Sequence, residues 1–321
     1  MKKAKVDVII PVYHPDGKLF RLLDKLAEQS VLPDRVYLMN TETGKPEDSC
    51  KELEKRIRTY FAKKRSYPVH QLRLKLVPVK KDEFDHGGTR HRAAMLSDNP
   101  YLLFMTQDAV PVDRSLIAAL LGALQKGADV AYARQMTRPG ANVVEAYTRL
   151  FNYPSHSEFR TKEAIKTKGI RAFFCSDVCA MYRRECYENL GGFVRKTIFN
   201  EDMIFAHGLL LSGGTLAYCA EARVYHSHNY TWTQQFHRNF DLGVSQADHP
   251  QIFCGVSSEA EGFRYVRGLL GYLLNQRYYL EAVDFLVESV FKYGGYFLGK
   301  HYRLLPKNLV LRCTTNPRYF Q

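Results

Sequence analysis

The sequence predicts an α/β protein with an open, mostly parallel sheet and helices on both faces of that sheet. Short runs rich in β-branched residues alternate with segments whose apolar residues recur at helical spacing, and this alternation continues to about residue 135. The chain has 321 residues and 45% hydrophobic content, enough to bury a large core. It contains no internal repeat and no low-complexity linker, so we expect one globular unit.

The expected elements follow in chain order. The first unit is a strand at 6–11, a turn, and a helix whose leucines between 19 and 26 share one face. The next are a strand at 35–39, a charged helix from about 46 to 64, a strand at 72–79, a helix in the second half of 85–96, a strand at 101–105, a helix capped by Asp113 that runs to Leu124, and a strand at 129–133. Beyond Ala172 the pattern is mixed, with a helix at 201–211 and two short strands between 212 and 228.

The net charge favours an anionic partner. Lys and Arg number 46 against 33 Asp and Glu, and the isoelectric point is near 9.3. Nucleic acid, anionic lipid and a phosphorylated small substrate all fit such an excess. Nucleic acid is the weakest of the three, because the cations are scattered and no pair of aromatic residues is placed as in RNA-binding sheets.

Three features bear on the compartment. The basic N-terminal tip precedes an apolar run that is short, carries Asp7 and ends at Pro11, so we interpret it as a strand and expect a cytoplasmic protein. No segment approaches the roughly 20 apolar residues that span a bilayer. The seven cysteines are an odd number, and we expect reduced thiols rather than disulfides or a zinc site.

The last third of the chain predicts two long helices, at 263–273 and 280–297, followed by a basic and aromatic segment. After Glu288 the chain has no acidic residue, whereas cations continue to Arg318. This mixture suits the interface of an anionic bilayer. The alternative is a helical pair packed on the sheet with a solvated basic face.

Ligands of parallel sheets bind outside the carboxyl ends of the strands, and FMTQDAVP places Asp108 at such an end. One carboxylate there can hold a divalent cation against a diphosphate, since Mg²⁺ takes one or two carboxylates together with substrate phosphates and waters. The alternative is that Asp108 only caps the following turn. The pattern DHGGTRHRAA offers glycine N–H groups and Arg90 to a phosphate, but it is neither a Walker loop nor a dinucleotide fingerprint.

Two further motifs carry candidate chemistry. NEDMIFA places Glu201 and Asp202 in the first turn of a helix, where acids complement the helix dipole and where Asp202 can also serve as a general base. VYHSHNY places His226 and His228 on one face of a strand end. A histidine there can complete a metal site with Asp108, or simply form hydrogen bonds.

These motifs in this order resemble the family-2 inverting glycosyltransferases of the GT-A fold and, within them, bacterial rhamnosyltransferases. The resemblance rests on VIIPVY, HGGTRH, FMTQDAVP, FFCSD, GGF with NEDMIFA, and YCAEARVYHSHNY, and it covers roughly residues 6–240. The segment KYGGYFLGKHYRLLPK is also similar to the tail of that subgroup.

The resemblance implies roles for individual residues. Asp108 is the metal-binding acid of a degenerate DxD motif, Asp202 is the catalytic base, and His226 is a further metal or diphosphate contact. The residues implied on the donor side are Pro11, Val12, Tyr13, Gly87, Gly88, Arg90 and Gln107. Asn40 and Thr41 stand where relatives often have an aspartate for the nucleobase, so that contact falls to Thr41 or Asp85. Asp177 and Glu201 are the candidates on the acceptor side, Glu201 also supporting its helix.

We therefore expect an enzyme that transfers L-rhamnose from dTDP-L-rhamnose to a hydroxyl of a lipid-linked surface polysaccharide precursor, with Mg²⁺ or Mn²⁺ as cofactor. The alternative, in which the same scaffold uses a UDP-hexose or a galactofuranose donor, stays open. The expected division is a nucleotide-sugar-binding part (1–135), an acceptor and catalytic part (136–245) and a basic helical part (246–321) that lies against the inner face of the cell membrane.

Overall fold

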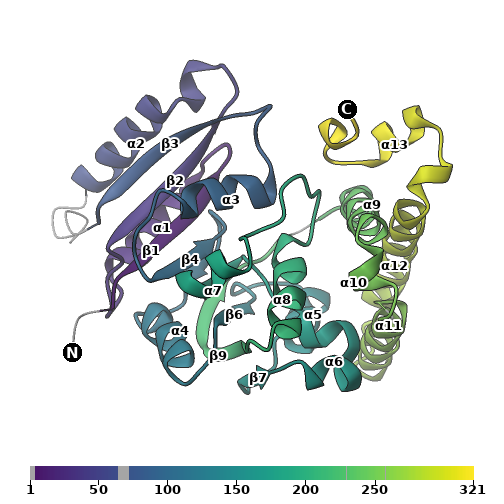
Figure 1. Cartoon of the computed structure of the whole chain (residues 1–321). Helices are drawn as coiled ribbons and strands as arrows, with labels where there is room; N and C mark the ends of the chain where they lie inside the picture. Colours follow the sequence, from purple (N-terminus) through teal and green to yellow (C-terminus); the bar gives the residue numbers. More distant parts are fainter. Residues whose placement is uncertain (1–3, 64–71, 229, 257) are drawn as a thin grey trace.

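The computed structural model describes residues 4–63, 72–228, 230–256 and 258–321. In these residues a nine-stranded sheet has the order β3-β2-β1-β4-β8-β6-β9-β5, and β7 pairs with β9 (Figure 1). Helices cover both faces of the sheet, as the sequence predicts. A group of C-terminal helices lies at one side of this body, away from β1 to β3 (Figure 1).

The N-terminal half alternates strands and helices. Its elements are β1 (Val6–Val12), α1 (Gly17–Ala27), β2 (Arg35–Glu42), the 3₁₀ turn η1 (Pro46–Asp48), α2 (Cys50–Ala62), β3 (Leu74–Lys80), α3 (His86–Ala94), β4 (Tyr101–Met105), β5 (Val110–Pro111) and α4 (Leu116–Gln125). The four leucines of α1 are fully buried, and each such burial stabilises the fold by roughly 1.5–3 kcal/mol. The expected end of the second helix at Lys64 lies outside the described residues, as does the basic tip at 1–3.

The second half continues the sheet and adds helices. Its elements are β6 (Val130–Met136), α5 (Val143–Asn152), β7 (Glu158–Arg160), α6 (Glu163–Lys168), η3 (Gly169–Phe173), β8 (Cys179–Arg183), α7 (Arg184–Asn189), α8 (Glu201–Leu211) and β9 (Leu216–Tyr225). Strands β1, β2, β3, β4, β6 and β9 run in one direction, while β5, β7 and β8 run against them. The expectation of a mostly parallel sheet is confirmed.

Alternation along the strands divides the core into two layers. Val8 and Ile10 of β1 face one cluster, which contains the buried leucines of α1, α2 and α4. Ile9 faces the other cluster, to which α3, α7 and α8 contribute. Because successive side chains of a strand point to opposite faces, one β-branched run can supply both layers.

The structure corrects three local expectations. The helix expected in the second half of 85–96 already begins at His86, because the Asp85 side chain accepts a hydrogen bond from the Gly88 N–H and caps it. The two short strands expected between 212 and 228 are one strand, β9, whose pairing with β6 shifts register after Ala133. The N-cap of α4 is Ser115 rather than Asp113. Asp113 instead accepts hydrogen bonds from the backbone and side chain of Ser115.

The C-terminal region is helical, as expected, but begins earlier. It comprises α9 (Trp232–Asp248), α10 (Pro250–Phe253), α11 (Ser258–Asn275), α12 (Tyr279–Lys300), η4 (Tyr302–Leu304), α13 (Lys307–Cys313) and η5 (Pro317–Phe320). The expected boundary at 245/246 falls inside α9, and the division into three parts stays a prediction. None of the described helices is long and apolar enough to cross a bilayer.

Helices α9 and α12 approach each other at backbone distance. A Cβ added at Gly295 would overlap the Phe236 carbonyl oxygen, and one added at Gly299 would overlap the Phe240 carbonyl oxygen. Glycine costs helix stability but permits this approach. The two glycines therefore explain how α12 is fixed against α9, the helix that follows the two histidines.

Candidate active site

The loops that follow β1 and β4 are hydrogen-bonded to each other at the carboxyl edge of the sheet. The Tyr13 N–H donates to Gln107 Oε1 at 2.9 Å, and Gln107 Nε2 donates to the Tyr13 carbonyl at 2.8 Å. These strands pair in parallel, so the loops that follow them emerge side by side. This pair of hydrogen bonds holds the loop that carries Asp108 beside the loop that follows Val12.

Asp108 lies against two histidines. Its Oδ2 atom is 3.2 Å from His228 Nε2, and its Oδ1 atom is 3.7 Å from His226 Nε2. The two Nε2 atoms are 2.9 Å apart. One ligand atom from each residue lies within 4.8 Å of the others, which is the spacing of a possible metal site. Hereafter Asp108, His226 and His228 are called the cation triad.

Strand pairing explains how the cation triad is assembled from residues more than a hundred positions apart. Asp108 precedes β5, and β5 pairs antiparallel with the end of β9 through Val110 and Tyr225. His226 follows β9 directly, and its N–H donates to the Met136 carbonyl of β6. The acid and the histidines therefore meet where β5 and β9 come together.

A second layer of hydrogen bonds orients His226. Gln135 Oε1 lies 2.9 Å from His226 Nδ1 and also accepts from Arg149 at 2.5 Å. Gln135 Nε2 donates to Ser176 Oγ, so its oxygen faces the histidine. An N–H at Nδ1 leaves the Nε2 lone pair free toward the triad. Burial lowers the pKa of both histidines, His226 well below its usual value, which favours the neutral form that binds metal.

The residues present fit a divalent cation. One carboxylate and two neutral imidazoles converge on one point, a ligand set that several divalent metals accept. Next to it is a cavity of about 470 Å³ whose lining includes His228, Lys18 and Arg138. Glu145 also lines the cavity, so the two cations leave it a net positive charge, which suits an anionic ligand bound beside a metal.

A second cluster surrounds Asp202 at the start of α8. Asp202 Oδ2 accepts from the Asp177 N–H at 3.0 Å, and Oδ1 accepts from the Met203 N–H at 2.7 Å. Arg90 Nη1 lies 3.1 Å from Glu201 Oε1, and its Nε lies 3.7 Å from Asp177 Oδ2. Hereafter Arg90, Asp177, Glu201 and Asp202 are called the acid cluster. One guanidinium faces three carboxyl groups, of which Asp177 and Glu201 are almost completely buried.

The environment of the acid cluster favours protonation of Asp202. Burial, together with the nearby charge of Glu201, raises the pKa of Asp202 to about 7. Burial also raises the pKa of Asp177 well above its usual value, while Arg90 opposes that rise. A carboxyl group with a pKa near 7 can both take and release a proton at neutral pH.

The two clusters are connected through two consecutive residues, Ser176 and Asp177. Ser176 is linked through Gln135 to His226, and the next residue, Asp177, donates its N–H to Asp202. The antiparallel pairing of β8 with β4 places the start of β8 beside the end of β4. The Thr106 N–H accordingly donates to the Val178 carbonyl. Asp108 and Asp202 therefore belong to one region of the molecule.

Three residues predicted to approach the phosphates have other partners. Gly87 packs so closely on the Val194 carbonyl that a Cβ would overlap it. The Gly88 N–H is bound to Asp85, and Arg90 is buried in the acid cluster with a further bond to the His86 carbonyl. The Gly88 N–H and the Arg90 guanidinium therefore have partners within the protein, and a contact of Gly87, Gly88 or Arg90 with a phosphate stays a prediction.

The remaining predicted donor residues lie near the carboxyl edge of the sheet. Pro11 and Val12 end β1, with Tyr13 exposed after them. Thr41 is buried in β2, and its hydroxyl has no hydrogen-bond partner among the described residues. Asp85 accepts from Gly88 and from the Thr197 N–H.

Sequence reasoning missed four residues of this edge. His228 was noted as a neighbour of His226, but only His226 was assigned to the metal. Lys18 and Arg138 line the cavity beside His228, and their sequence context carried no signal. Asp48 ends the turn η1, which follows β2 in the chain. Its carboxylate accepts a hydrogen bond from the Thr43 hydroxyl, and its Oδ1 atom lies 3.3 Å from His14 Nδ1. The hydrogen bond from Thr43 is the first cause of the lowered pKa of Asp48.

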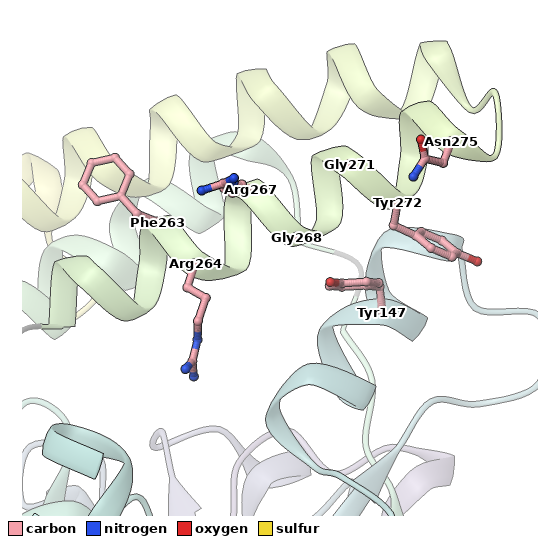
Figure 2. A pocket seen from close by; sticks show the side chains of 8 residues that line it. All are labelled: Tyr147, Phe263, Arg264, Arg267, Gly268, Gly271, Tyr272 and Asn275. Carbon is pink, nitrogen blue, oxygen red and sulfur yellow. The ribbon is translucent and has the colours of Figure 1, made fainter. Parts of the chain in front are cut away.

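A second hollow lies away from this edge. It is an open groove of about 840 Å³ between α5 and α11, lined by Tyr147 and Tyr272 together with Arg264 and Arg267 (Figure 2). The rings of Tyr147 and Tyr272 are 5.4 Å apart. No member of the cation triad or the acid cluster lines this groove.

Solved structures that share the fold are glycosyltransferases. A mannosyltransferase from Pyrobaculum calidifontis in complex with GDP-Man and Mn²⁺ has a TM-score of 0.60 at 14% identity, over 93% of this chain and 87% of that chain. S. aureus TarS 1-349 in complex with UDP-GlcNAc has a TM-score of 0.52 at 14% identity, over 94% and 92%. The expected GT-A fold is confirmed.

The chain belongs to glycosyltransferase family 2, because residues 4–241 match the family described as glycosyltransferase like family 2. Two relatives are similar over most of their length. The O-antigen chain rhamnosyltransferase RfbN of Salmonella typhimurium is 33% identical over 94% of this chain and 91% of its own. The O-antigen chain rhamnosyltransferase WbaN of Salmonella anatum is 38% identical over 72% of this chain and 74% of its own.

Proposed function

We propose that the protein transfers L-rhamnose from dTDP-L-rhamnose to a hydroxyl of a lipid-linked surface polysaccharide precursor, with inversion at the anomeric carbon. The observation that carries the proposal is the joined pair of clusters, a cation triad and an acid cluster linked through residues 135, 176 and 177. The names of the two Salmonella relatives support the choice of rhamnose.

In this proposal Asp108, His226 and His228 hold Mg²⁺ or Mn²⁺. A divalent cation held there would supply positive charge against the diphosphate leaving group. Lys18 and Arg138 line the adjoining cavity and contribute positive charge toward the same diphosphate. The Mn²⁺ bound to the Pyrobaculum mannosyltransferase supports a divalent ion in this fold.

Asp202 acts as the general base. Its carboxylate takes the proton of the acceptor hydroxyl while that oxygen forms a bond to the anomeric carbon. The bond from that carbon to the diphosphate oxygen breaks on the opposite side, so dTDP leaves and the configuration inverts. No covalent sugar–enzyme intermediate forms, and one carboxylate base suffices.

Neighbouring residues hold the base and the ligands. Asp177 orients Asp202 through its N–H and contributes, with Glu201, to the acceptor side, while Arg90 balances part of their charge. On the donor side we propose Pro11, Val12, Tyr13, Thr41, Asp85, Gln107 and Asp48. Gly87 and Gly88 serve the donor side indirectly, by letting α3 pack closely at this edge.

The main alternative is the same reaction with another nucleotide sugar, a UDP-hexose or a galactofuranose donor. The GDP-Man and UDP-GlcNAc bound to the two solved structures support this alternative, since the fold accepts different donors. A nucleic-acid-binding module is a distant second class, which a salt-dependent shift with RNA or duplex DNA would revive.

The place of action follows from the acceptor. A lipid-linked precursor is held at a bilayer, so we propose a cytoplasmic protein that lies on the inner face of the cell membrane. The excess of cations and the aromatic C-terminal region support this placement.

The decisive experiment compares dTDP-L-rhamnose with UDP-glucose, each with and without EDTA, on a GlcNAc-diphospholipid acceptor. We expect transfer from dTDP-L-rhamnose only, lost with EDTA and restored by Mg²⁺ or Mn²⁺. Transfer from UDP-glucose alone would favour the other donor class, and full activity in EDTA would contradict the role of the cation triad.

A further inference from the structure

Helix α12 has two apolar faces. Its inner face, which contains Ala282, Phe285, Gly295 and Gly299, is buried against α9 and α11. Its outer face is formed by Tyr279, Val283, Leu286, Val290, Tyr293 and Phe297, and all six are exposed. A surface helix ordinarily has one apolar face and one polar face. The outer face of α12 therefore lacks the polar side chains expected toward water.

The exposure of these side chains is large. Val283 is 61% exposed, Val290 is 70% exposed and Leu280, at the edge of the same face, is 85% exposed. The six residues recur at intervals of three and four, which keeps them in one stripe along a helix of 22 residues, about 33 Å long. A continuous exposed apolar stripe of this kind marks an interaction surface.

The charged residues of α12 lie elsewhere on the helix. Glu281 and Glu288 are each two positions, or about 200°, from Val283 and Val290. Glu288 pairs with Lys292 and accepts from Gln235 of α9, and Asp284 accepts from Trp232 Nε1. Asp284 and Glu288 thus contact α9, and no charged residue lies within the outer stripe between Tyr279 and Phe297.

We propose that the outer face of α12 docks on an anionic phospholipid bilayer, with the helix lying in the plane of the membrane surface. Aromatic rings of the stripe, Tyr279, Tyr293 and Phe297, suit the depth of the lipid headgroups. After Glu288 the chain carries cations and no acid, a distribution that favours anionic lipid. The helix rests on the membrane rather than crossing it, in agreement with its limited hydropathy.

The alternative occupant is a second copy of the chain. The three-four spacing resembles a coiled-coil seam, but such seams are flanked by charged residues that select the partner. The columns that directly flank this stripe are Leu280, Val287 and Gly294 on one side and Ala282, Ser289 and Tyr296 on the other. A helix that binds a lipid surface does not need charged residues beside its apolar stripe. The uncharged residues on both sides of this stripe therefore favour lipid over a second helix.

The inference deepens the proposed function and rests on it in one respect, since a lipid-linked acceptor gives the docking its purpose. It also narrows the expectation from the sequence, which assigned the membrane contact to the basic helical part at 246–321 as a whole. The structure points to the side of α12, with the cations beyond its C-terminal end as a secondary contribution.

The test uses the full chain and flotation with vesicles of phosphatidylcholine, with or without phosphatidylglycerol. We expect the wild-type protein to float with the anionic vesicles and the double variant Val283→Gln/Val290→Gln to bind at least about tenfold more weakly, since two apolar side chains no longer insert. Glutamine is used because it adds no charge. Leu211→Gln on α8, a residue 49% exposed in the wild type, is the matched control and should bind as the wild type does.

Two readouts keep this inference separate from the proposed function. The double variant should retain transfer to a GlcNAc-diphosphate acceptor with a short alkyl chain and lose transfer to the full lipid acceptor in vesicles. Equal flotation of variant and wild type would overturn the docking surface. Self-association of the wild-type protein that the double variant abolishes, measured by sedimentation equilibrium, would also overturn it in favour of a second copy. Vesicle binding without rhamnose transfer would leave the surface intact and contradict only the proposed function.

Discussion

The cation triad and the acid cluster place the same residue type in two different environments. Asp108 lies beside the Nε2 atoms of two histidines, whereas Asp202 lies among other carboxyl groups. Neutral histidines leave Asp108 available to a positive ion, but the crowding around Asp202 favours its uptake of a proton. The neighbours of an aspartate, rather than the aspartate itself, decide which charge state it favours and which chemistry is open to it.

The largest effect should follow from removing the proton acceptor. Asp202→Asn keeps the shape of the side chain but cannot take a proton, so kcat should fall by about 10²–10⁴-fold. Isothermal titration with dTDP should give the wild-type affinity, because the cation triad is unchanged. Loss of dTDP binding in this variant would show that the two clusters are not separate in function.

The next effect should follow from weakening the metal site. Asp108→Asn removes the only carboxylate of the cation triad, and we expect transfer to fall by about 100-fold and to require a higher Mn²⁺ concentration. Titration of activity with Mn²⁺ measures both changes. An unchanged Mn²⁺ requirement would place the cation at other residues.

A smaller effect should come from the second layer around the triad. Gln135→Leu removes the acceptor that orients His226, and the apparent affinity for Mn²⁺ should fall by about tenfold. Arg134→Leu on the same strand is a control that does not contact His226. If both variants behave alike, the hydrogen bond to Gln135 has no special role.

The pH dependence should distinguish the clusters further. Because the pKa of Asp202 is about 7, the rate should rise with pH through about 7 as the carboxylate forms. The charge of Glu201 helps to raise that pKa, so Glu201→Gln should move the rise to lower pH. A profile of kcat against pH measures the shift, and a profile that does not move would exclude Asp202 as the titrating group.

The smallest expected effect is on stability. A carboxyl group with a raised pKa stabilises the fold below its unfolded pKa of 3.8, and that contribution is lost as the pH rises through about 7. Asp202→Asn should therefore raise Tm at pH 8 and have little effect on Tm near pH 4. Differential scanning calorimetry at the two pH values tests this, and a lower Tm at pH 8 would contradict the burial argument.

Local patterns in the sequence predicted most of the sheet. The strands at β1, β2 and β4 and the helices α1 and α12 are specified by spacing over ten to twenty residues. Helix α9 was missed, because its WTQQFHRNFDLGVSQAD pattern is largely polar and its stability comes from packing on α12. The joining of two expected short strands into β9 depends on a register shift against β6, which no local pattern reveals.

The site was predictable only in part. The suggestion that Asp108 and His226 act together came from sequence, but the pairing of β5 with β9 that unites them is a contact between distant residues. Arg90 was expected at a phosphate because arginine beside glycines often binds one. Its burial between Asp177 and Glu201 depends on how α3 packs against α8, which the motif does not encode.

The glycine contacts between α9 and α12 have a mechanical consequence. Helix α9 begins four residues after His228, and Gly295 and Gly299 press α12 directly on its backbone. If α12 rests on the bilayer as proposed, this close packing would help to set the height of the proposed catalytic centre above the lipid. The enzyme would then select its acceptor by length, because only a sugar at the matching distance from its lipid anchor could reach the site and be extended.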